Sequence, residues 1–245
     1  MEIYVVGTIA VLLGGFLQGC LGFGFGLISV PPLLMVLAAA EVVPMQIALS
    51  VFLSLPLAWK ERSQIQPLLV GPLVIGAIIG LPAGMFVLQH FDGPLLKITI
   101  GILLVVMSFT MLTGWSYPIK RQLPALFPIG FLSGIMATSF SMAGPPIVLF
   151  LTNQNMDKNQ FRANILIYFA VLGVVAMTGY TYNGAYSQSS IMLISIFVPA
   201  VLLGGFAGAR VSTKVPQATF RRLTLLAAVI MGSLLIFRNL GLLIG

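Results

Sequence analysis

Eight apolar runs, separated by short polar or basic stretches, make up most of the chain. They extend over residues 3–39, 42–58, 67–89, 94–113, 123–151, 164–181, 189–209 and 223–244. Most are close to the roughly 20 residues that a membrane-spanning helix needs. They do not alternate apolar and polar residues, as the strands of a membrane barrel do. The pattern therefore predicts an all-α integral membrane protein.

The composition supports this fold class and excludes several kinds of protein. Of the 245 residues, 59% are hydrophobic and 7% are charged, and the mean hydropathy is +1.09. A water-soluble globule could not cover such a composition with polar surface. The net charge of +7 comes from basic residues scattered between apolar runs, so we expect no binding of nucleic acid. Cys20 is the only cysteine, which excludes an internal disulfide and a thiolate-rich metal site, and we expect no cofactor.

The distribution of basic residues indicates which runs cross the membrane. If all eight runs crossed once, the twelve Lys and Arg residues would divide five against seven between the two sides. If the run at 123–151 enters and leaves on one side, ten lie on one face and only Lys97 and Arg238 on the other, as the positive-inside rule favours. About 29 helical residues are also too long for one crossing and too short for two. The charges therefore predict a re-entrant hairpin at 123–151.

The chain also contains an internal repeat, because the glycine-rich stretch Gly14–Gly26 is matched by a similar stretch within 128–146. This predicts two inverted-topology repeats, residues 1–122 and 123–245, which together form one transmembrane domain. Each repeat is expected to contain a broken or re-entrant helical hairpin plus three transmembrane helices. The sequence does not separate one broken helix over 3–39 from two short crossings. The N-terminus lacks a basic region and a cleavage pattern, so we expect it to be a membrane segment and not a removable signal.

Prolines follow each glycine-rich stretch. Because proline lacks an N–H and is tolerated in the first turn of a helix, Pro31-Pro32 and Pro145-Pro146 are expected to begin short helices at 33–39 and 147–151. The N-terminus of each helix presents free backbone N–H groups and the positive end of the helix dipole, which suit an anion and which lipid cannot satisfy. Two such ends that face each other predict a site for one small anion near the midplane.

The candidate substrate-binding residues are glycines of irregular backbone, polar side chains near these helix ends, and one arginine. They are Gly22, Gly24, Gly26, Ser29, Gln46, Ser139, Ser141, Gly144, Arg162 and Asn164. Glycines alternating with aromatics at 22–26 disfavour helix and favour a backbone that lines a cavity. Each candidate side chain also has a structural interpretation. The serines fit a hydrogen bond to the carbonyl four residues before them in their own helix as well as they fit substrate binding. Arg162 also fits an ordinary arginine at the cytoplasmic edge of the membrane.

Four other glycine pairs at i,i+4 spacing favour close helix packing over ligand binding. They are Gly15 with Gly19, Gly80 with Gly84, Gly130 with Gly134, and Gly204 with Gly208.

No Asp, Glu, His or Lys lies clearly inside an apolar run, and His90 and Asp92 fall in a predicted outer loop. Proton-coupled carriers usually hold a carboxylate or histidine within the membrane, so the coupling ion, proton or sodium, stays open, as does a homodimer. An intramembrane hydrolase would need a buried nucleophile and base. The sequence therefore does not predict an enzyme.

At the paired glycine-rich segments and the prolines, the chain resembles the sulfite exporter TauE/SafE family of membrane permeases over nearly its full length. The stretch Ser141–Leu151 is similar to the second-half signature of that family, and Phe161–Asn164 to the segment after it. Ser139, Ser141 and Ala143 stand where many members have glycine. The resemblance implies a secondary transporter in the bacterial cytoplasmic membrane that moves a small anion, such as sulfite, a sulfonate or another sulfur-containing organic acid, by alternating access. An anion channel of the same architecture is the alternative, and the residues do not fix the direction of transport.

Overall fold

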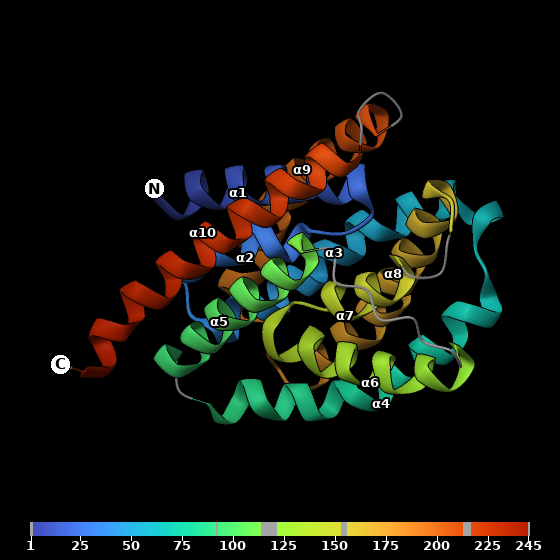
Figure 1. Cartoon of the computed structure of the whole chain (residues 1–245). Helices are drawn as coiled ribbons and strands as arrows, with labels where there is room; N and C mark the ends of the chain where they lie inside the picture. The colour runs from blue at the N-terminus through green and yellow to red at the C-terminus, as the bar shows by residue number, and fades with distance from the viewer. Residues whose placement is uncertain (1, 92, 114–121, 153–155, 213–216, 245) are drawn as a thin grey trace.

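The structure, a computed structural model, describes residues 2–91, 93–113, 122–152, 156–212 and 217–244 (Figure 1). In this part of the chain the regular elements are all helical, with no strand. They are α1 (Glu2–Leu21), α2 (Phe25–Val36), α3 (Ala39–Lys60), the 3-10 helix η1 (Arg62–Gln64), α4 (Pro67–His90), α5 (Gly93–Leu112), α6 (Gln122–Phe140), α7 (Gly144–Thr152), α8 (Lys158–Tyr182), α9 (Gln188–Val211) and α10 (Gln217–Ile244). The predicted all-α fold is confirmed.

Within the described ranges, seven helices are long and apolar enough to span a membrane, namely α1, α3, α4, α5, α8, α9 and α10. The other α-helices are shorter, and α7 has only 9 residues. Each of the two longest apolar runs is interrupted and forms more than one helix. The run at 3–39 gives α1 and α2 and begins a third helix, α3, and the run at 123–151 gives α6 and α7.

The predicted starts of the two short helices have different outcomes. Helix α7 begins at Gly144, directly before Pro145-Pro146, as expected. Helix α2 begins at Phe25 and contains Pro31-Pro32 in its interior, so the prediction of a helix start at 33 is wrong. Pro31 and Pro32 carry no N–H for the carbonyls of Leu27 and Ile28 but do not interrupt α2, and the left-handed Gly22 and Gly24 set where the helix begins.

Close backbone packing joins α1 to α9 and α4 to α6, and Figure 1 shows α4 and α6 side by side. A Cβ added at Gly15 would lie 2.6 Å from the carbonyl oxygen of Val201, and a Cβ added at Gly19 would overlap the carbonyl oxygen of Gly205. Because the residue numbers increase together along this contact, α1 and α9 run in the same direction. Helices α4 and α6 are parallel for the same reason, with these facing residues: Gly76 and Phe127, Gly80 and Phe131, Gly130 and Leu73, Gly134 and Ala77. The expected packing role of the glycine pairs is confirmed.

The basic residues gather where α3 and α9 end and α8 begins, and we call this end of the bundle the basic face. Arg162 of α8 lies 2.8 Å from Glu61 after α3, and Lys158 donates to the carbonyl of Ser212 after α9. Lys97 lies at the opposite end of the bundle, where it donates to the carbonyl of Leu34 near the end of α2. Arg238 is within electrostatic reach of Lys97. The described basic residues thus divide as the charge pattern favours, whereas Lys120, Arg121 and Lys214 lie outside the described residues.

These contacts fix the course of the two hairpins. Because α1 runs parallel to α9, it ends near the basic face, and α2 returns to the opposite end of the bundle at Leu34. Helix α4 begins near the basic face, where the backbone N–H of Gln66 donates to Asn164 of α8, and α6 runs parallel to α4. The α1–α2 hairpin therefore starts and ends at one end of the bundle, and the α6–α7 hairpin at the other.

The helices also pair across the two halves: α1 packs against α9, α6 against α4, α3 against α8, and α5 against α10. In the first two pairs, the first α-helix of one half contacts the fourth α-helix of the other. A twofold relation between the halves would produce this set of pairs. The boundary of the repeats near residue 122 and their inverted sense in a membrane stay predictions.

We expect Gly208→Ala to destabilise the protein, because a Cβ at Gly208 would overlap the carbonyl oxygen of Phe16 on α1. Overpacking of this kind costs about 1–3 kcal/mol. The matched control is Gly71→Ala in α4, where an added Cβ meets nothing within 4 Å. Thermal unfolding of the purified protein in detergent measures the difference. Equal midpoints for the two variants would mean that the seam between α1 and α9 is looser than described.

Candidate functional site

The first helix interruption lies between α1 and α2 and depends on glycine. Gly22 has φ of 87° and Gly24 has φ of 105°, in the left-handed region that residues with a Cβ rarely adopt. The N–H of Gly22 bonds the carbonyl of Gln18 at 2.7 Å and closes α1. Gly24 then occupies the N-cap position of α2, where it has no side chain to accept a hydrogen bond from the first turn of the helix.

The first turn of α2 leaves backbone donors free. The first intrahelical donor is the N–H of Ile28, which bonds the carbonyl of Gly24 at 3.4 Å. The amides of Phe25, Gly26 and Leu27 have no acceptor among the described residues. Lipid cannot satisfy such groups, so this helix end is a place for water or an anion.

The second interruption, between α6 and α7, uses a serine where the first uses glycines. Ser141 has φ of 56°, and it is the one described non-glycine residue with positive φ. Its N–H bonds the carbonyl of Ala137 at 2.9 Å, and the N–H of Met142 bonds that of Met136 at 3.1 Å, which closes α6. Because Pro145 and Pro146 carry no N–H, the first turn of α7 has fewer backbone donors than that of α2.

Side chains from α8 hold the second interruption in place. The hydroxyl of Tyr168 donates to Ser133 Oγ at 2.8 Å, and Ser133 in turn donates to the carbonyl of Ala143 at 2.6 Å. The hydroxyl of Tyr180 donates to the carbonyl of Thr138. Both tyrosines are buried, so these bonds fix the loop from inside the bundle.

The two interruptions touch each other, because a Cβ added at Gly26 would overlap the carbonyl oxygen of Ser141. Between them lies a cavity of about 70 Å³. That is room for a small anion or several waters, since one water needs about 10–15 Å³ on the same measure. The cavity is lined by Gln18, Phe23, Gly24, Phe25, Gly26, Leu27, Ile47, Ser50, Ala137, Ser141, Met142, Ala143, Gly144, Pro145, Phe169, Leu172, Gly173 and Ala176.

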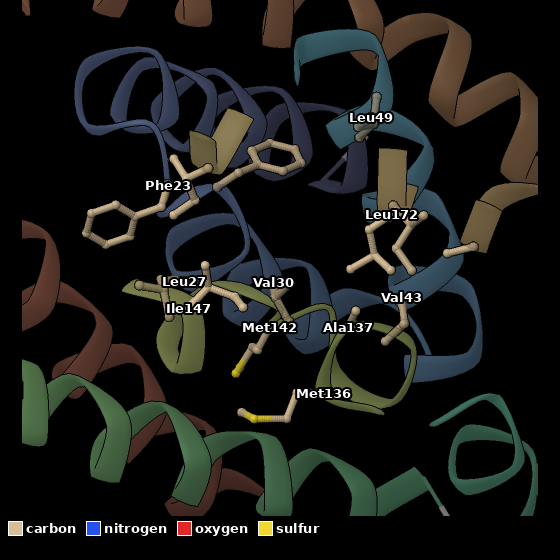
Figure 2. Close-up of a cluster of buried hydrophobic side chains, with 14 of the residues drawn as sticks. Phe23, Leu27, Val30, Val43, Leu49, Met136, Ala137, Met142, Ile147 and Leu172 are labelled. Carbon is tan, nitrogen blue, oxygen red and sulfur yellow. The ribbon is translucent and has the colours of Figure 1, made fainter. Parts of the chain in front are cut away.

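The wall of this cavity is mostly apolar, with a few neutral polar groups and no charged side chain. Figure 2 shows apolar side chains of the same region, namely Leu27 of α2, Ala137 of α6 and Leu172 of α8, with Phe23 and Met142 from the two interruptions. The polar side chains are those of Gln18, which donates to Ser54 Oγ at 2.8 Å, and of Ser50 and Ser141. The searched residues contain no cluster of His, Cys, Asp or Glu that could hold a metal ion.

The structure brings four of the predicted site residues to the cavity: Gly24, Gly26, Ser141 and Gly144. Gly22 lies behind it, where a Cβ would come 2.8 Å from Ile165. Ser139 is turned away and donates to the carbonyl of Gly84 at 3.2 Å. Neither residue is among those that line the cavity, and their role in binding stays a prediction.

The other four predicted residues form contacts outside the cavity lining. Ser29 donates to the carbonyl of Phe25 at 2.6 Å, the i−4 bond that serines in membrane helices commonly make, and accepts a bond of 2.7 Å from Gln46. Asn164 accepts the N–H of Gln66 at 2.7 Å and so caps α4. Arg162 pairs with Glu61. These side chains fix helices around the site, and Gln46 Oε1 is buried without a hydrogen-bond partner.

Sequence reasoning missed most of the apolar wall and one polar group. Ser50 lies one helical turn after Gln46 on α3, and that spacing was a usable signal. On α8, Phe169, Gly173 and Ala176 recur at helical spacing along one face, but the sequence does not distinguish that face from the other apolar faces of the helix.

Comparison with known proteins agrees with this geometry. The family described as Sulfite exporter TauE/SafE matches residues 7–235. The probable sulfite/organosulfonate exporter TauE of Cupriavidus necator is 23% identical over 218 residues, which cover 85% of this chain and 84% of the relative. No solved structure matches.

Family membership, together with the helices of spanning length, indicates a multi-pass protein of the bacterial cell membrane. The family consists of membrane exporters and not of enzymes, so the chain is a membrane transport protein. The match extends from the first helix to the last and includes both interrupted segments. The chain therefore belongs to the sulfite exporter TauE/SafE family.

Proposed function

We propose that this protein is a secondary transporter that binds one small sulfur-containing anion, such as sulfite or a sulfonate, in the cavity between the two helix interruptions. The observation that carries the proposal is the first turn of α2, where the amides of Phe25, Gly26 and Leu27 have no acceptor among the described residues and where these three residues line the cavity. They add hydrogen-bond donors to the positive end of the α2 dipole, and lipid offers them no acceptor.

The character of the wall favours an anion with a compact charged group and an apolar remainder. Phe25, Gly26 and Leu27 of the first turn of α2 line the cavity, and the apolar part of its wall includes Ile47, Phe169 and Leu172. Hydrogen bonds from neutral donors stabilise the charged form of a carboxylate or sulfonate group, so the group can stay ionised in a cavity whose wall carries no cation. The printed name of the relative in Cupriavidus necator, a probable sulfite/organosulfonate exporter, supports the sulfur-containing members of this class.

Alternating access is the mechanism that we propose for this site. Each hairpin is joined to a helix of the other half by backbone contact, α1 to α9 and α6 to α4. Two rigid units result, one with the α1–α2 hairpin and α9 and the other with the α6–α7 hairpin and α4. Because the two tips meet at Gly26 and Ser141, rocking of one unit against the other would open the cavity to one face at a time.

We expect Gly26→Ala to reduce anion transport by on the order of tenfold or more, because its Cβ would overlap the Ser141 carbonyl and push the two tips apart. Gly71→Ala in α4 is the control, because an added Cβ there meets nothing within 4 Å and Gly71 does not line the cavity. Flux of radiolabelled sulfite into reconstituted vesicles measures both variants. Equal flux would mean that contact between the tips does not shape the site.

Counterflow distinguishes the carrier from the anion channel of the same architecture. A carrier with one alternating site exchanges labelled for unlabelled anion across the vesicle membrane, so we expect unlabelled sulfite or sulfonate inside the vesicles to accelerate uptake of the label. Single-channel currents without such acceleration would favour the channel. No flux with any anion of a panel of sulfite, thiosulfate, sulfonates and carboxylates would reject transport through this cavity.

A further inference from the structure

A second charged constellation, outside the cavity, lies between it and the basic face. Arg162, in the first turns of α8, is 4% exposed. Its Nη2 lies 2.8 Å from Oε1 of Glu61, the residue that follows α3, and its Nη1 donates to Ser212 Oγ at 2.6 Å. The pair therefore ties together α8 and the ends of α3 and α9.

This ion pair leaves hydrogen-bonding capacity unused. Nε and Nη2 of Arg162 and Oε2 of Glu61 are buried with no hydrogen-bond partner among the described residues, although Nη2 lies at ion-pair distance from Oε1. A buried guanidinium with unused donors is costly unless another acceptor joins it at some stage of function. The planar fork of arginine is suited to a carboxylate, sulfonate or similar oxyanion.

The position of Arg162 is directly behind the first helix interruption. A Cβ on Gly22 would lie 3.3 Å from both Cα and Cγ of Arg162. The neighbouring Phe161 packs edge-on against Phe23, with ring centroids 6.2 Å apart, and Phe23 lines the cavity. An anion that moves between the cavity and the basic face would thus pass next to the guanidinium.

We propose that Arg162 is a second anion-binding station on the basic-face side of the cavity, and that the Glu61 carboxylate occupies it when no substrate is present. The inference rests on the proposed transport function. An incoming anion and the Glu61 carboxylate compete for the same guanidinium, and the anion gains access when Glu61 takes up a proton. No bond is made or broken other than the O–H bond on Glu61, whose proton comes from the water at the basic face.

The groups around Glu61 make its protonation a usable signal. Burial raises the pKa of the Glu61 carboxyl above its ordinary value, and the nearby Arg162 and Lys60 cations offset part of that rise. Other charged residues at this end include Arg62 on η1, Asp157 and Lys158 at the start of α8, and Arg210 on α9. Because its pKa is raised, a larger fraction of Glu61 is protonated at a given pH than of an ordinary glutamate, and competition with the anion weakens as the pH falls.

The test measures transport of ethanesulfonate from the basic face, in inverted membrane vesicles, between about pH 4.5 and 8, a range that extends upward from the ordinary pKa of a glutamate carboxyl, the direction in which the pKa of Glu61 is shifted. Ethanesulfonate keeps its charge throughout, so the pH dependence belongs to the protein. We expect KM of the wild type to rise with pH by on the order of fivefold. Glu61→Gln should give the low KM at every pH, whereas Arg162→Gln should raise KM about thirtyfold or more at every pH.

Glu41→Gln is the matched control, because Glu41 lies at the opposite end of the same helix. It should keep the pH dependence of the wild type. A KM that does not change with pH in the wild type, or a pH dependence that survives in Glu61→Gln, would overturn the proposal, and the wild-type measurement decides even if the variants fail to accumulate. Absence of any ethanesulfonate flux in the wild type, with other anions also inactive, would instead count against transport itself.

Discussion

Lipid offers no hydrogen bonds to a peptide group, and this constraint governs the centre of the molecule. Two helices stop inside the bundle, at Leu21 and at Phe140, and the backbone that follows each of them has to be surrounded by protein or by a polar cavity. The chain meets that demand by bringing the two interruptions into contact at Gly26 and Ser141. The residues that carry the remaining free donors, on the first turn of α2, line the cavity between the two interruptions.

The glycine seams follow from the same demand. A hairpin that starts and ends at one end of the bundle needs a neighbour that holds its tip at depth, and α9 and α4 provide this through backbone contact with α1 and α6. Where Gly204 and Gly208 face Leu12 and Phe16, even one methyl group would not fit. Without a hydrophobic force between helices in lipid, such close packing is the main source of association.

Sequence patterns predicted the helical fold, the two interrupted runs and the packing glycines, because each depends on local composition. They did not locate the start of α2. Pro31-Pro32 looked like a helix start by the first-turn rule, but the positive φ of Gly22 and Gly24 ends the preceding helix, so α2 starts at Phe25. The partners of Ser139 and Asn164 are 55 and 98 residues away, in Gly84 and Gln66, and only the fold shows that they are occupied by structural bonds.

The same correction changes the picture of the site. The sequence suggested two equivalent helix ends around one anion, yet the donors are unequal, because α2 begins with three amides and α7 begins with Gly144 followed by two prolines. An anion in the cavity would therefore bind closer to α2, and α7 would contribute mainly its dipole and the Ser141 loop. Helix α2 also contacts α10, and Lys97 of α5 holds its C-terminal end, so the stronger half of the site belongs to the better-anchored helix. The asymmetry therefore bears on where an anion would bind and not on the direction of net transport, which the gradients of the transported species across the membrane set.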